Sequence, residues 1–530
     1  MMSDVPWLSL LVLVPLVGAV AVPFLRGSAA LTKQVGLGVS LATLALAVAV
    51  ALQYDVDGGM QLSETHDWIS AFGVHYALGV DGLGLLLVLL TAVLVPVVLL
   101  ASWRDDEGYL DGGAQGSPAG FVAWTLALEA LSLAVFLATD VFLFYVVFEA
   151  TLIPAYFLIG GFGRVGRSAA AVKFLMFQLA GGLVLLGGVI GLYVVSAQQG
   201  TPSYLLSDLT ELDMSTSAGR WLFAAFFIAF AIKAPLFPVH TWLADTTEKA
   251  TPGTAVLLVC VLDKIGTFGM LRFCLGLFPE ASQWATPLVV VLALVSIVYG
   301  ALVAIGQDDL MRLIGLTSLS HFGFITLGIF VFSSQGGTGS ILYMVNHGLG
   351  TAALFLVAGY VVARRGTASI REMGGAEKVT PVLAGLFLVA GLAALGLPGL
   401  STFVSEMLVI IAAFDYAWYV GAVAVTGIVL AAIYALWMYQ RTMTGPTVEP
   451  VPGTVRESRD LTTRELVAVA PLFVGLVLFG FYPMPLMEAA DPYVGDLLSQ
   501  VGVTDDPPEV GADAHSDAGS DSDTAEEGEN

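Results

Sequence analysis

The chain has 530 residues, of which 57% are hydrophobic and only 12% are charged. Soluble domains carry about 25% charged residues, so this composition excludes a soluble protein and predicts an all-α protein that crosses a membrane many times. The two cysteines, Cys260 and Cys274, stand in one apolar run without a CxxC pair, which gives no indication of an iron–sulfur cluster or a zinc site.

The formal net charge of −23 is unusual for a membrane protein. Residues 505–530 hold ten acidic residues and no lysine or arginine, so they account for ten of these charges. Such a segment is expected to be disordered. The acidic bias is consistent with a source adapted to very high salt, and equally with a tail that only promotes solubility.

Fourteen apolar runs are long enough to cross a membrane as helices. The runs are residues 6–25, 34–53, 81–101, 119–138, 140–160, 174–195, 220–243, 254–277, 284–304, 311–332, 339–363, 381–414, 417–439 and 465–486. The first run lacks a basic stretch before it and a convincing cleavage site after it, so we interpret it as a span rather than a signal peptide.

An even number of spans places both ends of the chain on the same side. Sixteen loop lysines and arginines fall in one alternate set of loops, and only Arg220 falls in the other. Because basic loops stay inside the cell, this split predicts a multi-pass protein of the plasma membrane with both termini and the acidic tail outside.

The seventh run contains a lysine at the depth of the membrane centre. Lys233 is followed at once by Pro235 and Pro238, which cannot donate backbone hydrogen bonds, so the carbonyls of Ala231 and Ala234 are expected to lose their i+4 partners. An ionised lysine at this depth costs about 2.5–3.5 kcal/mol. The nearest helix end is about 18 Å away at 1.5 Å per residue, too far for the side chain to reach water along the helix. A broken helix beside a polar cavity is therefore predicted.

The twelfth run shows a second interruption. Gly396, Pro398 and Gly399 break it, and Glu406 follows about two turns later. Because the two broken runs are five spans apart, we predict two five-helix repeats of opposite orientation, residues 119–277 and 284–440. The remaining segments are then residues 1–118 with the first three spans, 464–486 with the last span, and the acidic tail 487–530.

Several further ionisable residues lie within apolar runs, each on a different predicted helix. They are Glu129, Glu149, Lys264, His321 and His347. If these residues and Lys233 had no partners, inserting them into the membrane would cost on the order of 10 kcal/mol. We therefore expect them to meet one another and water in a continuous polar path. Burial disfavours the charged forms of both amines and carboxylic acids, so both can exchange protons near neutral pH. A single buried histidine is more often a hydrogen-bonded core residue.

Asp263 precedes Lys264 directly, but it points about 100° away around the helix, so no pairing between the two is assumed. The glycines Gly161, Gly163 and Gly166 spell GxGxxG, yet they join two spans without a βαβ unit. A dinucleotide site is therefore not expected there.

At these residues the chain resembles the antiporter-like, proton-translocating membrane subunits of respiratory complex I, and among them the M-type subunits of NADH-quinone oxidoreductases, the counterparts of mitochondrial subunit 4. The resemblance runs from about the third to the thirteenth span. Its anchors are FYVVFEATLIP, IKAPLFPVHTWLAD, LDKIGTFGMLRF, SLSHFGF, MVNHGLGTAALF and GLPGLSTFVSE.

The resemblance implies fourteen helices, two inverted repeats and breaks in helices 7 and 12. It also implies a proton path through Glu149, Lys233, Lys264 and Glu406, assisted by His240, His321 and His347, with Glu129 as a secondary carboxylate. No cofactor is expected on this chain, since quinone, flavin and iron–sulfur clusters belong to partner subunits. The implied partners are L-, N- and K-type membrane subunits and the lipid bilayer.

One position separates the subtypes within this resemblance. The L- and N-type subunits and the sodium/proton antiporter subunits carry a lysine at the position of Glu406, whereas the M type carries a glutamate. The chain departs from the family pattern at Thr246 and Thr247, which stand where an alanine and a histidine are usual, and at Pro252, which is displaced by one residue.

Other functions stay open on the sequence alone. One is a subunit of a multi-subunit sodium/proton antiporter, which needs no electron transfer. Others are the equivalent subunit of a membrane-bound hydrogenase or of a deazaflavin-linked dehydrogenase. A passive scaffold is disfavoured by the cost of the buried charges.

Overall fold

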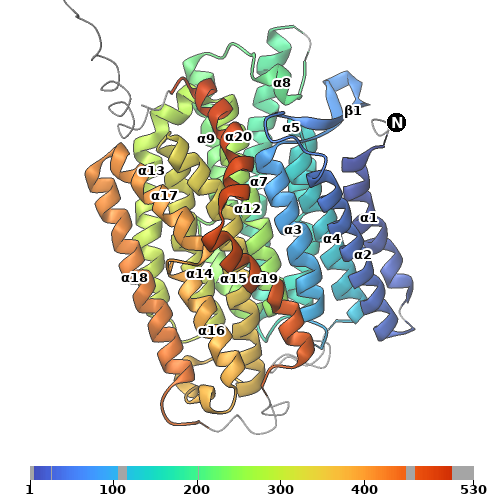
Figure 1. The fold of residues 1–530 in the computed structure, drawn as a ribbon. Helices are drawn as coiled ribbons and strands as arrows, with labels where there is room; N and C mark the ends of the chain where they lie inside the picture. Colours follow the sequence, from blue (N-terminus) through green and yellow to red (C-terminus); the bar gives the residue numbers. More distant parts are fainter. Residues whose placement is uncertain (1–4, 26, 105–115, 201, 449–459, 504–530) are drawn as a thin grey trace, which may run out of the picture.

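A computed structural model describes residues 5–25, 27–104, 116–200, 202–448 and 460–503. The protein is a bundle of long helices that run roughly parallel to one axis (Figure 1). A two-stranded antiparallel hairpin, β1 (Gln61–Ile69) and β2 (Val74–Val80), lies at one end of the bundle, which we call the hairpin end. Both ends of the described chain lie there too (Figure 1).

The first half of the bundle contains eight spans. Their helices are α1 (Trp7–Ala21), α2 (Ala29–Ala51), α3 (Gly82–Ala101), α4 (Pro118–Leu137), α5 (Val141–Ala150) with α6 (Leu152–Phe162), α7 (Arg167–Gln198), α9 (Thr216–Lys233) with α10 (Thr241–Lys249), and α11 (Pro252–Val256) with α12 (Lys264–Gly269). The eighth span also contains two π-helical segments, η5 (Leu257–Leu262) and η6 (Met270–Leu275). The short α8 (Leu206–Leu209) lies in the loop before α9.

The second half contains the remaining spans. They are α13 (Pro279–Ile305), α14 (Leu310–Phe330), α15 (Ser334–Arg365), α16 (Pro381–Ala394) with α17 (Ser401–Tyr416), α18 (Trp418–Met443) and α19 (Thr463–Phe481). Thirteen helices of the described chain are long and apolar enough to cross a membrane. The one remaining predicted span, the twelfth, is divided between α16 and α17, of 14 and 16 residues, so the predicted number of spans is confirmed.

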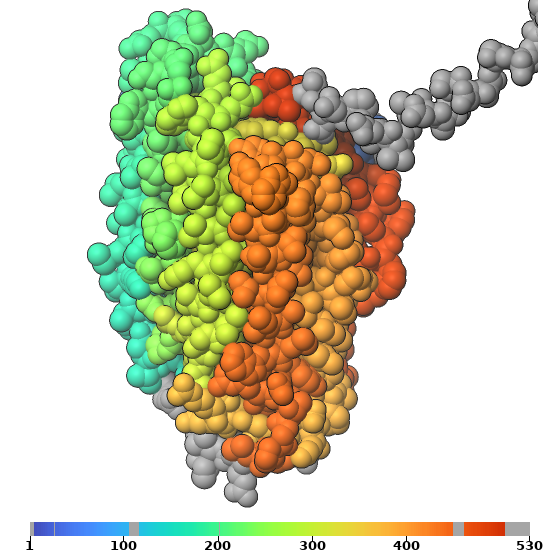
Figure 2. All heavy atoms as spheres, turned by 90° about the vertical axis from the view of Figure 1, so that its left-hand side faces the viewer, coloured from blue at the N-terminus to red at the C-terminus, as the bar shows by residue number. Residues whose placement is uncertain are grey.

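The spans differ in how deeply they are buried. The eighth span, α14 and α15 are buried along their whole apolar windows, whereas α1, α2 and α19 bury only about a third or less. Figure 2 shows α13 and α18 side by side on the outer surface, where large apolar side chains such as Leu288, Val291 and Val429 are exposed. The ionisable residues of the eighth span, α14 and α15 therefore lie in the interior, away from lipid.

One predicted boundary is wrong. Residues 484–501, assigned mostly to the tail, form a further helix, α20 (Met484–Val501), which packs on α3 and α15. Its apolar residues, including Leu486, Val494 and Leu498, are buried. Asp491 and Asp496 are exposed, and these acidic residues make the segment resemble the acidic tail in the sequence. The acidic residues 505–530 lie outside the described residues.

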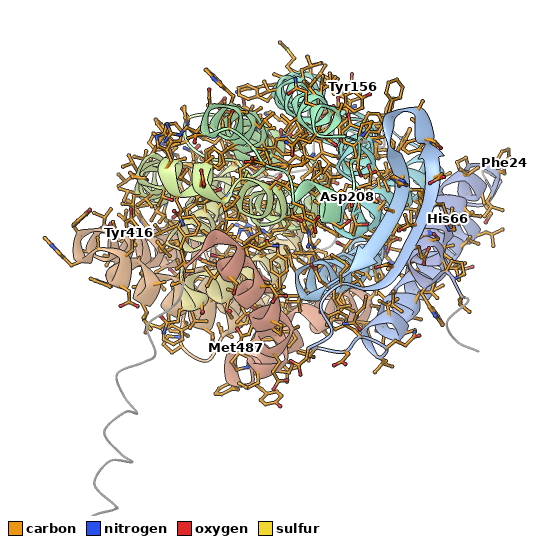
Figure 3. All side chains as sticks on the ribbon, turned by 90° about the horizontal axis from the view of Figure 1, so that it is seen from above. Phe24, His66, Tyr156, Asp208, Tyr416 and Met487 are labelled. Atoms are coloured by element: carbon orange, nitrogen blue, oxygen red, sulfur yellow. The ribbon has the colours of Figure 1, made fainter. Side chains whose placement is uncertain are left out.

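Seen from the hairpin end, the hairpin with His66 and the loop with Asp208 lie over this end of the bundle, and α20 with Met487 lies along its side (Figure 1 and Figure 3). The hairpin was not predicted, since its residues alternate poorly between apolar and polar. It packs against α4 and α5, and the Asp140 carboxylate at the start of α5 accepts a hydrogen bond from the His75 backbone N–H at 2.8 Å.

Candidate proton path

Lys233 is the last residue of α9, at the first break. Its side chain is 1% exposed. The ammonium donates to Thr151 Oγ1 at 3.3 Å and lies 4.7 Å from the centroid of the Phe148 ring. Both partners belong to the junction of α5 and α6 and flank Glu149 in sequence, so Lys233 reaches the helix end that carries this carboxylate.

The backbone at the break satisfies itself more completely than predicted. The carbonyl of Ala231 accepts from the Leu236 N–H at 3.0 Å, and the carbonyl of Ile232 accepts from the Trp242 indole at 3.1 Å. Ala231 therefore lacks its i+4 donor, as predicted, but the chain turns so that the N–H of residue i+5 takes its place. Lys233 is held by a hydroxyl and an aromatic ring, and none of the described hydrogen bonds joins it to these carbonyls.

Glu149 lies near Lys233 but does not bond to it. Among the described residues, no ion pair within 4.0 Å joins their side chains, and Glu149 Oε1 is buried without a hydrogen-bond partner. The two charges interact electrostatically across a longer distance. The carboxylate fills the space above Gly182 of α7, where an added Cβ would lie 1.7 Å from Oε1. A glycine is therefore required for Glu149 to occupy this position.

Lys264, at the start of α12, is fully buried and contacts α15. Its Nζ lies 2.6 Å from His347 Nδ1 and 4.3 Å from the centroid of the Phe322 ring. The rings of His347 and His321 are 5.1 Å apart, centroid to centroid. Three of the predicted residues, from three different spans, thus form one contact chain.

His321 extends this chain to the second break. Its Nε2 lies 3.2 Å from the carbonyl of Ala394, the last residue of α16, and 3.1 Å from the hydroxyl of Tyr434 on α18. Its ring centroid is 6.0 Å from that of Tyr343. The interruption of the twelfth span therefore begins beside an imidazole.

Glu406 lies just beyond the second break, in α17, and is 4% exposed. The Tyr343 hydroxyl donates to its Oε1 at 2.5 Å. Gly396 has a φ of 72°, and an added Cβ there would lie 1.8 Å from Glu406 Oε2. The glycine predicted as a helix breaker thus also makes room for the carboxylate. Lys264, His347, His321, Tyr343 and Glu406 form one line from the eighth span into the second half of the bundle.

Besides Glu149 and Lys233, two further predicted residues lie outside this line. Glu129 on α4 is 1% exposed, and neither carboxylate oxygen has a hydrogen-bond partner. It shares one buried helix face with Thr125 and Ser132, whose hydroxyls also lack partners. His240, in the turn before α10, is 5% exposed and stands edge-on to Tyr299, with ring centroids 5.4 Å apart. Neither residue contacts Lys233, Lys264 or Glu406 among the described hydrogen bonds.

Sequence reasoning missed three residues that contact the predicted proton-path residues. Tyr343 lies four residues before His347, which places both on one face of α15, so this spacing could have revealed it. Thr151 follows Glu149 by two residues and carried no signal. Tyr434 carried none either, because its proximity to His321 depends on how α18 packs against α14 and α17.

The end of the bundle opposite the hairpin carries a network of ion pairs. Asp245 accepts from Lys173 and Arg312, each at 2.6 Å, and Glu248 accepts from Arg312 at 2.8 Å and from Lys249 at 2.6 Å. Burial alone would raise the pKa of both carboxyls, but these hydrogen bonds and positive charges lower the pKa of Asp245 and of Glu248 below their usual values. The network ties α7, α10 and α14 together.

Within the part of the chain that the structure describes, no three His, Cys, Asp or Glu side chains converge to hold a metal ion. The groups that do converge are amines, imidazoles, phenols and carboxyls. Each can bind and release a proton, and the arrangement can therefore pass protons between neighbouring groups and enclosed water.

Residues 138–431 match the protein family described as NADH:quinone oxidoreductase/Mrp antiporter, TM. The chain is 49% identical to NADH-quinone oxidoreductase subunit M of Mycobacterium tuberculosis, over 96% of this chain and 97% of the relative. It is 34% identical to NADH-ubiquinone oxidoreductase chain 4 of Arabidopsis thaliana, over 93% and 97%. Its fold is similar to a chain of respiratory complex I from Thermus thermophilus with bound NADH, with a TM-score of 0.83, 31% identity and coverage of 94% and 100%.

Proposed function

Since the chain belongs to the NADH:quinone oxidoreductase/Mrp antiporter membrane family, we propose that it is a proton-translocating membrane-arm subunit of a complex I-type quinone oxidoreductase. The relatives that support this assignment match almost the whole chain. As such a subunit it contributes to an enzyme whose electron transfer takes place on partner subunits, which hold the quinone, flavin and iron–sulfur clusters.

The observation that carries the proposal is the contact line from Lys264 to Glu406. Its members come from the eighth span and from α14, α15 and α17, and every one is buried. A path of this kind is costly to insert in a membrane unless the groups hydrogen-bond to one another, which Lys264 with His347 and Tyr343 with Glu406 do. A structural scaffold has no need of such a line.

Glu149 and Lys233 supply the other half of the mechanism. In this structure they interact without touching. If a conformational change brings the carboxylate to the ammonium, Lys233 holds its proton more tightly; if the pair separates, it releases the proton more readily toward Lys264. Electron transfer elsewhere in the complex would drive this alternation.

Topology and partners complete the proposal. Both described ends lie at the hairpin end, and basic residues such as Lys173, Lys249 and Arg312 gather at the opposite end. By the positive-inside rule, the hairpin end faces outward across the plasma membrane. We further propose that the helices of residues 119–277 and 284–440 are inverted repeats and that L-, N- and K-type subunits flank the chain.

A sodium/proton antiporter subunit is the main competing function, because the matched family includes antiporter components. The full-length relatives at 49% and 34% identity are oxidoreductase subunits, which supports the first function. Glu406 also supports the oxidoreductase function, because the antiporter subunits carry a lysine at that position.

The test replaces Lys233 in the complex and measures protons moved per electron in sealed vesicles. Lys233→Ala and Glu149→Ala are each expected to abolish or sharply reduce pumping while the complex assembles, because each removes a carrier or its partner. Lys233→Arg is also expected to fail, since arginine does not release its proton. Arg220→Ala is the matched control: this cation lies on the same helix, α9, and stacks on Trp284 at 4.6 Å. A wild-type ratio in Lys233→Ala would show that the path does not include this residue.

A further inference from the structure

Asp263 is a buried carboxylate that the path described above does not use. It is 1% exposed, and its Oδ2 has no hydrogen-bond partner. Among the described residues, no lysine, arginine or histidine lies within ion-pair distance of it. An unpaired, unsolvated carboxylate is costly in such a place, so Asp263 is either protonated or bonded to enclosed water for part of its cycle.

The Asp263 carboxylate interacts electrostatically with both buried lysines, Lys264 and Lys233. Gly266, one turn along the same helix face, packs directly against the backbone of Ala234, where an added Cβ would lie 2.4 Å from the Ala234 nitrogen. Because Asp263 and Gly266 share a face, Asp263 faces the break that begins after Lys233. Lys264 points elsewhere, toward His347.

The helix is irregular at this point. Asp263 follows the π-helical segment η5 (Leu257–Leu262), and its N–H donates to the carbonyl of Leu258, five residues back, at 2.9 Å. Such wide turns are frequent at functional sites, where they reposition side chains around the helix axis. Because consecutive helical residues point about 100° apart, Asp263 faces the first break while Lys264 contacts His347 in the second half of the bundle.

We propose that Asp263 is a proton carrier between Lys233 and Lys264, joining the first break to the line that ends at Glu406. An N–H bond of the Lys233 ammonium breaks as an O–H bond forms on the Asp263 carboxylate, through a bridging water. That O–H bond then breaks as an N–H bond forms on the neutral Lys264 amine. The carboxylate is restored, charge is conserved, and no oxidant or reductant takes part. This inference rests on the proposed function, because it adds a step to the same path.

The test compares Asp263→Asn with Asp263→Glu in the assembled complex, reconstituted in vesicles. Asparagine has the shape of aspartate but cannot carry the proton, whereas glutamate can. Pumping per electron in Asp263→Asn is expected to fall to the level of Lys233→Ala, and Asp263→Glu is expected to retain most of it. Cys260→Ala is the matched control, since Cys260 is a fully buried residue one turn earlier on the same helix.

Wild-type pumping in Asp263→Asn overturns the inference, and so does an equal loss in Asp263→Asn and Asp263→Glu. If Asp263→Asn does not assemble, infrared difference spectra during turnover replace it: the carbonyl-stretch band of a protonated carboxylic acid must shift between wild type and Asp263→Glu, and an unshifted spectrum overturns the inference. The proposed function fails separately, through normal pumping in Lys233→Ala. Loss in Lys233→Ala with normal pumping in Asp263→Asn overturns only the relay.

Discussion

Removing the hydroxyl of Tyr343 changes the contact line at a single bond. Tyr343 is 1% exposed, and its hydroxyl donates to Glu406 Oε1 at 2.5 Å. Tyr343→Phe keeps the ring and its packing beside His321, so the change is confined to one hydrogen bond. Because the bond stabilises the ionised carboxylate more than the neutral acid, its loss makes Glu406 harder to deprotonate.

The magnitude follows from the nature of this bond. A hydrogen bond to a charged group contributes about 1.5–3 kcal/mol. Since about 1.4 kcal/mol corresponds to a factor of ten, the population of ionised Glu406 is expected to fall about 10- to 100-fold. A pumping step that needs this form should slow by the same factor if it limits turnover, while the folded structure is preserved.

The assay is the initial rate of proton uptake into vesicles, measured beside the rate of quinone reduction. Tyr419→Phe is the control, because Tyr419 is an exposed residue of α18 that stacks edge-on against Trp418. A wild-type pumping rate in Tyr343→Phe, with the hydrogen bond shown to be absent, would refute the reasoning that Glu406 depends on this donor.

Three further predictions concern stability and topology. Asp81 and Arg272 form a bidentate ion pair at 2.5 and 2.8 Å, with side chains 7% and 10% exposed, so Asp81→Ala should lower the free energy of unfolding in detergent by about 3–5 kcal/mol. The double variant Asp81→Ala, Arg272→Met should recover part of this loss. An unchanged free energy of unfolding in Asp81→Ala would contradict the prediction. The lowered pKa values of Asp245 and Glu248 stabilise the fold at any pH above the usual values of about 3.9 and 4.3, and this contribution is lost as the pH falls through the lowered values. The thermal midpoint of unfolding should therefore drop below about pH 4, and it should drop less steeply in Arg312→Gln. An equally steep drop in the wild type and in Arg312→Gln would count against the network. Single cysteines at Ser63 in the hairpin and at Ser499 on α20 should react with an impermeant reagent from outside, and one at Ser369 only from inside; labelling of Ser369 and Ser499 from the same side would exclude the fourteen-span topology.

The span count and both breaks could be predicted because their signals are local. An apolar run of about 20 residues identifies a span. Pro235 and Pro238 at the first break, and Gly396 and Pro398 at the second, remove backbone donors or admit a positive φ. The structure places the breaks at Ala234–His240 and Leu395–Leu400, where these residues lie.

Features that depend on packing could not be predicted. The α20 helix buries its apolar face only because α3 and α15 offer a surface for it, and its acidic residues hide that face in sequence. The contact between Lys264 and His347 depends on the eighth span lying beside α15, which no periodicity reveals. The rescue of the Ala231 carbonyl by Leu236 depends on the path of the chain after the prolines.

The central claim is that electron transfer in partner subunits drives protons through this chain to Glu406. It is tested most directly by following proton and sodium movement together, in vesicles that contain the purified complex and are energised by a quinone-linked donor. Moving each proton outward against about 150 mV costs about 3.5 kcal/mol, so the last carrier must alternate between holding and releasing its proton. We predict proton movement that stops without the donor, is lost in Glu406→Gln and persists in part in Glu406→Lys. Sodium/proton exchange without any electron transfer would contradict the account and favour an antiporter.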